Sequence, residues 1–359
     1  MPDVLLFGAT GYTGGLTARA LADRGVDFAV AGRDRSRLEA VAEQTGASEV
    51  RIAQASDTGS LVGALAGCRV LLTCVGPFVR LGDTAVEAAL RARVHYVDST
   101  GEGTFIDRLE TRYGRRARET EVTLAPAMGF DEAPADLAAH LATEGMTRAD
   151  LTLTYAVPST ASPGTVRSAL GILASEAPFL DGGRRVLVGT GALERWAPMP
   201  PPLGPRRSVS APLAELNLAP LHLNLDRLSV YMTTGNLQRW GLRWGLPVLR
   251  VALKARGVGD ALTGALAKLI PRPDSAAARA KRWTILAEAR AGERWRNVVA
   301  SGTDVYGLSA HMLAAAAQRL AADGVGEPGV RTPVQVMGAD RLRAELEAGG
   351  VTIDMFQPS

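Results

Sequence analysis

Near its start the chain reads Val4-Leu5-Leu6-Phe7-Gly8-Ala9-Thr10-Gly11-Tyr12-Thr13-Gly14, a short apolar run that leads directly into a glycine-rich turn. The run predicts a buried strand, and residues 13–24 predict the helix that follows. The glycines recur at every third position: the first permits a tight turn, the second lets the backbone approach a pyrophosphate, and the third allows close helix packing. A plain structural turn is the alternative. The position between strand and helix favours dinucleotide binding by the turn residues Gly8, Thr10, Gly11, Tyr12, Thr13 and Gly14.

The alternation of strand and helix continues beyond this turn. Apolar runs at residues 28–32, 50–53, 69–73, 94–97 and 121–124 predict further strands, and residues 36–44, 58–66 and 83–93 predict helices between them. Strands that alternate with helices in this way build a parallel sheet covered by helices. The sequence therefore predicts an α/β protein whose N-terminal part is a Rossmann domain with a doubly wound parallel sheet.

The second strand is followed by Arg33, and this residue bears on the choice of cofactor. An acidic residue there would accept hydrogen bonds from the ribose 2′-hydroxyl of NAD, whereas a guanidinium suits the 2′-phosphate of NADP. The neighbouring arginines could instead be the solvated first turn of the helix at 36–44, and Asp34 offsets part of their charge. We favour NADP(H), with Arg33, Ser36 and Arg37 as its contacts.

Three later strands also end in residues suited to a ligand site. Val75-Gly76-Pro77 follows the strand at 69–73, and we expect this break to contact the nicotinamide ribose rather than form a plain turn. Asp98 and Glu102 follow the strand at 94–97, and Asp131 follows the strand at 121–124. Each carboxylate could act as acid or base, or cap the next helix. We take Asp98 as a cap, and Glu102 and Asp131 as candidates for proton transfer or for orienting the donor.

Composition limits the other functions. A net charge of +3 over 359 residues, with scattered basic residues, does not indicate nucleic-acid binding. No uncharged apolar run reaches the roughly 18 residues of a membrane span, and a strand beginning at Val4 leaves no room for a signal peptide, so we expect a cytoplasmic protein. Cys68 and Cys74 flank one strand about 20 Å apart, too far for a disulfide. Cysteines and histidines show no zinc-ligand spacing, and we expect no metal.

The pattern changes after the first 150 residues. Residues 151–157 alternate with a period of two, and residues 282–290 and 294–301 read as an antiparallel hairpin. We therefore predict a second α+β domain with a mixed sheet. The expected division is a Rossmann domain at 1–130, a substrate and dimerisation domain at 131–300, and a C-terminal segment at 301–359 that returns to the Rossmann domain.

Two stretches of the second domain allow more than one interpretation. The proline-rich segment 197–205 is a loop that either covers the active site or joins strands, and the second is the simpler reading. Residues 237–270 mix tryptophans and aliphatic residues with basic ones, so they could contact a membrane surface or line a tunnel for an apolar substrate. A pair of amphipathic helices in the core or at a homodimer interface is favoured.

Several of these motifs occur together in one known family. The glycine turn, Ala31-Gly32-Arg33, the segments 74–78 and 95–102, and Gly129-Phe130-Asp131-x-x-Pro134-x-Asp136 resemble the saccharopine dehydrogenase-like family, especially its trans-acting enoyl reductase branch. The tail motifs at 304–310 and 331–333 are similar to that branch as well, whereas residues 150–290 match loosely. The resemblance implies an NAD(P)-dependent enzyme with a Rossmann domain and an inserted α/β domain, which often dimerises.

The expected reaction is hydride transfer from NADPH to a C=C bond of a lipid- or polyketide-like substrate. The parent family implies reduction of a C=N bond in an amino-acid conjugate, and a protein that senses NADP without chemistry is a third possibility. The stretch 151–166 has no basic residue to bind amino-acid carboxylates and the stretch 237–270 is apolar, which favours the enoyl substrate, although Arg167, Arg184 and Arg185 could still converge. A short-chain dehydrogenase mechanism is excluded because no lysine follows a tyrosine by four residues.

Overall fold

The computed structural model describes residues 1–157, 176–235, 276–322 and 328–357. The chain divides into two compact units: the first comprises Met1–Ala133 and Val305–Gly349, and the second comprises Pro134–Asp304 and Gly350–Ser359. The predicted division differs at the end of the chain, because residues 350–359 belong to the second unit and not to the first.

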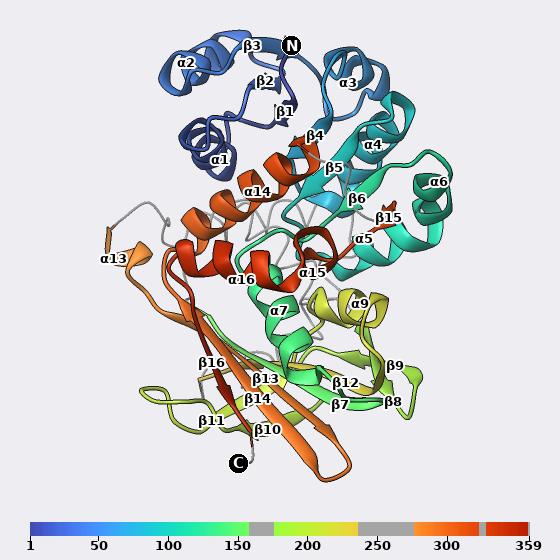
Figure 1. Cartoon of the computed structure of the whole chain (residues 1–359), viewed down its shortest axis with the longest axis vertical. Helices are drawn as coiled ribbons and strands as arrows, with labels where there is room; N and C mark the ends of the chain where they lie inside the picture. The colour runs from blue at the N-terminus through green and yellow to red at the C-terminus, as the bar shows by residue number, and fades with distance from the viewer. Residues whose placement is uncertain (158–175, 236–275, 323–327, 358–359) are drawn as a thin grey trace, which may run out of the picture. The chain divides into compact units, whose positions relative to one another are not determined.

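The first unit is built on a seven-stranded parallel sheet in the order β15-β6-β5-β4-β1-β2-β3 (Figure 1). Its strands are β1 Val4–Phe7, β2 Phe28–Gly32, β3 Glu49–Ile52, β4 Val70–Thr73, β5 His95–Asp98, β6 Thr123–Ala125 and β15 Gly329–Val330. The chain builds outward from β1 in one direction and then from β4 in the other. This arrangement is the predicted Rossmann sheet, and its switch point, where such sheets bind ligands, lies between β1 and β4.

The helices of the first unit follow its strands. They are α1 Tyr12–Asp23, α2 Arg35–Thr45, α3 Thr58–Ala64, α4 Phe78–Ala92, α5 Gly103–Arg108, α6 Gly114–Glu119, α14 Val305–Ala322, α15 Pro333–Met337 and α16 Ala339–Ala348, with a π-helical turn, η1 Leu109–Tyr113, between α5 and α6. Every residue of β1 and β4 is buried, as parallel strands covered on both faces require.

The C-terminal part of the chain completes this unit. Helix α14 packs against α1 and against β1, β4 and β5. Its polar residues His311 and Gln318 meet the guanidinium of Arg24 at the end of α1, and Arg24 also forms an ion pair with Glu345 of α16. One arginine therefore joins three helices, two of which come from a segment about 300 residues away.

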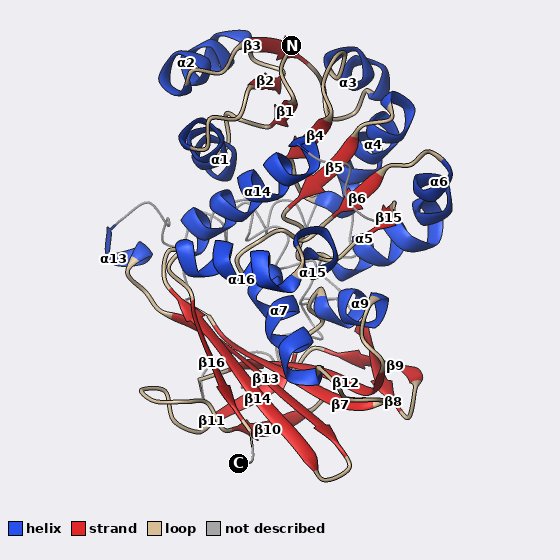
Figure 2. Ribbon diagram, in the orientation of Figure 1, coloured by secondary structure: helices blue, strands red, loops and turns tan. Residues whose placement is uncertain are grey.

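The second unit contains a mixed sheet (Figure 2). Its main path is β10-β11-β12-β7-β13-β14-β16, and a hairpin of β8 and β9 joins it at β12. The strands are β7 Ala149–Ala156, β8 Glu176–Asp181, β9 Arg184–Gly189, β10 Glu194–Ala197, β11 Arg206–Ser210, β12 Leu225–Thr233, β13 Trp283–Ala291, β14 Arg294–Gly302 and β16 Thr352–Phe356. Helical segments of the unit are α7 Glu132–Thr143, which begins in the first unit, α9 Glu215–Leu218, η2 Ala219–Leu221 and α13 Ala276–Arg279.

The predicted alternation and hairpin of this sheet are present. In β7 the side chains of Leu151, Leu153 and Tyr155 are buried, while Asp150 and Thr152 face the other side and are half-buried. Strands β13 and β14 pair from Trp283 opposite Gly302 to Ala291 opposite Arg294. Only β12 and β7 run parallel to each other among the described pairs of this sheet, which makes it mixed as expected.

The proline-rich loop joins β10 to β11 and also covers part of the sheet. Ala197, Met199 and Leu203 pack against Leu286 of β13 and Val299 of β14. Leu286 lies opposite Thr154 of β7, on the face away from Leu153 and Tyr155, so the loop covers an apolar patch on that second face. The predicted helices at 237–270 lie outside the described residues.

Candidate cofactor and active site

The turn after β1 has the close packing that its three glycines predict. Gly8 has a positive φ of 92°, and a Cβ added to it would lie 2.7 Å from Cγ2 of Val75. A Cβ on Gly14 would lie 2.1 Å from the carbonyl oxygen of Gly8, so a side chain there would push α1 away from the turn. No side chain caps the start of α1. These features fit a pyrophosphate, whose oxygens would accept from the backbone amides of this turn.

The predicted arginines lie at the start of α2, next to the glycine turn. Asp34 is the N-cap of α2 and accepts a hydrogen bond from the backbone amide of Arg37. The Arg37 guanidinium donates to the carbonyl oxygen of Thr10 at 3.0 Å, which ties the start of α2 to the turn after β1. The side chains of Arg33 and Ser36 are exposed. This surface therefore offers guanidinium groups and a hydroxyl to a phosphate, and it fits NADP better than NAD.

Glu102 caps helix α4, which begins directly after the Gly76-Pro77 break. Pro77 is the N-cap residue of α4 and has no side-chain group to satisfy the first amides of that helix. Glu102 supplies one: its Oε1 accepts from the amide of Phe78 at 3.0 Å, and its Oε2 accepts from the amide of Val79 at 2.8 Å. A buried carboxylate at a helix N-terminus is held by charge-assisted hydrogen bonds and by the helix dipole. This geometry favours positioning of the Gly76-Pro77 segment over proton transfer by Glu102.

Asp98 is fully buried at the end of β5 and holds two loops. Its Oδ1 accepts from the amides of Thr100 at 2.8 Å and Ala127 at 3.0 Å, and its Oδ2 accepts from the hydroxyl of Tyr96 at 2.5 Å. Burial raises the pKa of Asp98 to about 6, although these three hydrogen bonds act in the opposite direction. Burial beside this carboxylate also raises the pKa of Tyr96 well above its ordinary value. Asp98 therefore fixes the loop after β6 and is not placed to meet a substrate.

Two carboxylates, Asp131 and Glu132, stand together where the loop after β6 leads into α7. The side chain of Glu132 is only 2% exposed, and a Cβ added to Gly101 or to Gly129 would lie 2.6 Å from one of its oxygens. Asp131 is half-buried beside the same glycines, with Oδ1 3.1 Å from the position of a Gly129 Cβ. Glu132 was not predicted as a site residue from the sequence. The signal that could have revealed it is the pair of glycines that follow β5 and β6, because such positions often leave room for a neighbouring side chain.

The tail motif reaches this region from α14. The ring of Tyr306 packs edge-on against Tyr12 of the glycine turn, with centroids 5.1 Å apart. Ser309 accepts a hydrogen bond from the amide of Phe130 at 3.0 Å and donates to the carbonyl of Val305. The two segments that carry the cofactor turn and the Asp131 loop are thus both supported by the same helix.

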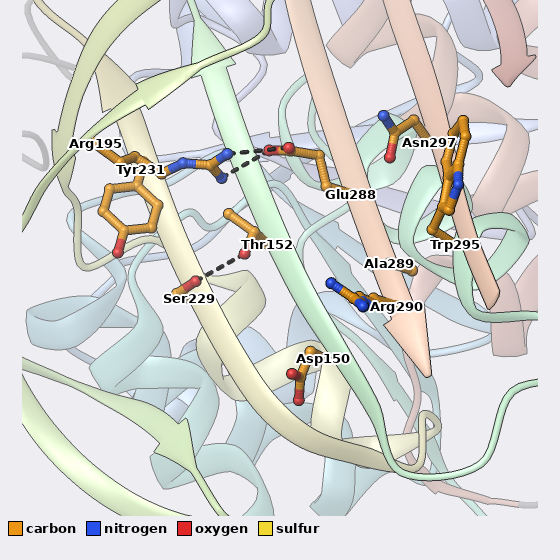
Figure 3. A pocket seen from close by; sticks show the side chains of 10 residues that line it. All are labelled: Asp150, Thr152, Arg195, Ser229, Tyr231, Glu288, Ala289, Arg290, Trp295 and Asn297. Atoms are coloured by element: carbon orange, nitrogen blue, oxygen red, sulfur yellow. Dashed lines mark hydrogen bonds and ion pairs between the residues drawn. The ribbon is translucent and has the colours of Figure 1, made fainter. Parts of the chain in front are cut away.

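A separate hollow of about 600 Å³ lies on the polar side of the second sheet (Figure 3). Arg195 and Glu288 reach toward each other across it and form a two-pronged ion pair at 2.7 and 3.0 Å, and the hydroxyls of Thr152 and Ser229 are 3.1 Å apart. None of the predicted cofactor or catalytic residues lines this hollow. The hollow is therefore distinct from the predicted cofactor site.

The described residues hold neither a metal-ligand cluster nor a membrane-spanning helix. Within the described ranges, no three His, Cys, Asp or Glu side chains gather in a way that could hold a metal ion. In the same part of the chain, no helix combines the length and the apolar character needed to cross a membrane.

Comparison with known proteins agrees with this geometry. Residues 4–133 match the saccharopine dehydrogenase NADP binding domain. A Mycobacterium tuberculosis protein provisionally named a trans-acting enoyl reductase is 30% identical over 98% of this chain and 96% of its own length. A trans-acting enoyl reductase of Mycobacterium ulcerans is 38% identical over 38% of this chain and 34% of its own. Saccharopine dehydrogenase (L-Glu forming) of Saccharomyces cerevisiae has the same fold, with a TM-score of 0.62 and 14% identity over the whole of both chains.

The fold, the glycine turn and the matched domain define an NADP-dependent oxidoreductase. The chain belongs to the saccharopine dehydrogenase-like family, in the branch of the trans-acting enoyl reductases.

Proposed function

We propose that the protein is an enoyl reductase that acts in trans and uses NADPH to reduce the C=C bond of a lipid- or polyketide-like acyl substrate. The observation that carries this proposal is the likeness, along nearly the whole of both chains, to the Mycobacterium tuberculosis relative with that name. The glycine turn, Arg33 and Arg37 would hold the cofactor, which supplies the hydride when bound. Gly76 and Pro77 stand at the neighbouring strand end, at the switch point where the nicotinamide ribose is expected.

Reduction of an enoyl group also needs a proton at the carbon next to the carbonyl. Asp131 is our candidate for delivering it or for orienting the water that does, because it is half-buried in the loop between β6 and α7, beside Glu132. Glu102 is assigned a supporting role, since both of its oxygens bond the start of α4. A general acid of this kind contributes about 10²- to 10⁴-fold in rate.

The test is turnover with NADPH against a panel of enoyl thioesters of increasing chain length, next to cyclic and amino-acid imines. Loss of the reduced-nicotinamide absorbance with the thioesters alone is the expected result. Oxidation of NADPH by the imines alone would establish the C=N alternative, and binding of NADPH without turnover on any compound would favour a sensor.

The proton donor is tested by matched amide variants. Asp131→Asn should lower kcat by about 10² or more with NADPH affinity retained, whereas Glu102→Gln should weaken NADPH binding and lower stability, because its amide group meets a backbone N–H. Full turnover by Asp131→Asn would remove Asp131 from the chemistry.

We also infer that the protein is cytoplasmic and works as a homodimer assembled through its second unit. The support for the homodimer is the mixed sheet of that unit, whose outer strands have an unpaired edge among the described residues and call for cover.

A further inference from the structure

Strand β9 is an unusually exposed apolar strand. Strands β8 and β9 form a hairpin that turns at Gly182 and Gly183, both with positive φ. In the part of the chain that the structure describes, β9 pairs with β8 alone. Val186 is 47% exposed and Leu187 is 68% exposed, the highest value among the large hydrophobic residues described after Met1. An apolar strand with an open edge is a template for pairing with another chain.

The backbone of Leu187 points toward the open edge. Pro178 lies directly opposite Leu187 in the hairpin, and proline has no N–H to donate. The two residues therefore cannot exchange both hydrogen bonds of a bonded pair, and they form a non-bonded pair of the antiparallel ladder. It follows that the N–H and C=O of Leu187 are directed away from β8, where a second strand could use both.

We propose that this edge is where a second copy of the chain docks, with the two β9 strands antiparallel and Leu187 on the twofold axis. The proposal rests on the homodimer inferred above and names its surface. A twofold axis makes an interface self-complementary, so Leu187 meets the partner's Leu187 and exchanges both backbone hydrogen bonds with it. In the same register Val186 lies opposite the partner's Val188, which sets apolar side chains against one another.

The charges of the hairpin fit this register and disfavour its neighbours. Arg185 would stand across from the partner's Gly189, which has no side chain. The next residue along that row is the partner's Glu176, because Glu176 pairs with Gly189 within each hairpin. The Cα atoms of Arg185 and the partner's Glu176 would be two strand spacings, about 10 Å, apart. An arginine and a glutamate side chain together can span this distance. Centring the pair on Arg185 would place two guanidinium groups side by side, and centring it on Val186 would set Leu187 against an arginine.

Cysteine substitutions test the register. In a bonded pair the Cα atoms are about 5.5 Å apart, within the range of a disulfide. Leu187→Cys alone should therefore yield a covalent dimer under mild oxidation, while Val186→Cys and Val188→Cys should each stay uncrosslinked alone and should crosslink when the two variants are mixed. The unsubstituted protein, which carries Cys68 and Cys74, sets the baseline. A disulfide formed by Val186→Cys alone would overturn the proposed register.

Light scattering separates this inference from the dimer on which it rests. Leu187→Lys should weaken association about tenfold or more, because a lysine cannot be buried on the axis at low cost. Met355→Lys is the matched control, since Met355 is 50% exposed on β16 of the same sheet, and it should remain dimeric. If the unsubstituted protein has the 37.7 kDa mass of the monomer, the homodimer inferred above does not form. A dimer that survives Leu187→Lys, or that is lost only in Met355→Lys, removes β9 as its surface.

Discussion

At the scale of single residues, Arg33 is expected to decide between NADPH and NADH. It follows β2 directly, is exposed, and stands beside Arg37, whose guanidinium already bonds the glycine turn. Arg33→Ala should weaken NADPH binding about 10- to 100-fold and leave NADH binding nearly unchanged, because a hydrogen bond to a charged group contributes about 1.5–3 kcal/mol. Fluorescence titration with both reduced cofactors measures this.

Arg35→Ala is the matched control for that titration. Arg35 lies two residues further on, is also exposed, and pairs with Glu39 one helical turn away at 3.7 Å. Its removal should change NADPH affinity far less than removal of Arg33. Equal losses in the two variants would mean that the whole basic surface attracts the cofactor and that Arg33 makes no specific contact.

Asp98 should make the stability of the protein depend on pH. Its pKa in the folded state is about 6, above the value of 3.8 expected when unfolded, so the folded state binds the proton more tightly. The resulting stabilisation is fully present below about pH 4 and is lost as pH rises to about 6, a change of roughly 3 kcal/mol. Asp98→Asn removes this dependence and keeps the three hydrogen bonds if the Tyr96 hydroxyl accepts instead of donating.

Denaturant unfolding at several pH values between 4 and 7 measures the effect. The free energy of unfolding of the natural protein should fall relative to Asp98→Asn over this range, and the variant should be at least as stable at pH 7. A constant difference between the two proteins would show that Asp98 is ionised throughout or does not titrate here. Asp98→Ala should be less stable at every pH, since it leaves the buried amides of Thr100 and Ala127 without an acceptor.

Residues of the site differ in how far the sequence could predict them. The turn glycines could be predicted because their role is local: Gly14 must be glycine since it touches Gly8 six positions earlier. The capping of α4 by Glu102 could not be predicted, because that helix begins 24 residues before Glu102 in the chain. Glu132 was missed for the same reason, as the two glycines that enclose it follow different strands.

At the scale of elements, strands β1 to β6 of the first sheet were predicted within about two residues, because buried parallel strands are continuous apolar runs. The short strand β15 of the same sheet was not predicted. Helix α4 begins five residues earlier than its predicted start at 83, because Glu102 supplies the cap that the sequence around Pro77 lacks. Strands β8 to β11 were not predicted. Pro178 within β8 argues against a strand, and it is tolerated because it lies at a position that needs no donor.

At the scale of the whole molecule, the chain passes between the two units three times. It leaves the first unit after Ala133, returns at Val305, and leaves again after Gly349 to add β16 to the second sheet. Periodicity could predict that the helix at 305–322 has a buried face, but the unit that receives each segment depends on contacts between residues far apart in the sequence. The end of the chain is an example: four of the five residues of β16 are exposed, so the strand shows no alternation of buried and exposed residues from which its place could be predicted.

This topology predicts that the last ten residues can be removed without loss of cofactor binding. Strand β16 pairs only with β14 among the described residues, from Asn297 opposite Phe356 to Ser301 opposite Thr352. A chain that ends at Gly349 should keep its affinity for NADPH within about twofold, while hydrogen exchange in β14 should rise because that strand becomes an edge. The milder variant Ile353→Pro, which breaks the same strand, should act in the same direction.

By contrast, a chain that ends at Asp304 loses α14 and the contacts of Tyr306 and Ser309 with the cofactor turn and the Asp131 loop, and it should not bind NADPH. Loss of NADPH binding in both the Gly349 chain and Ile353→Pro would show that β16 supports the first unit and that the division at Gly349 is wrong.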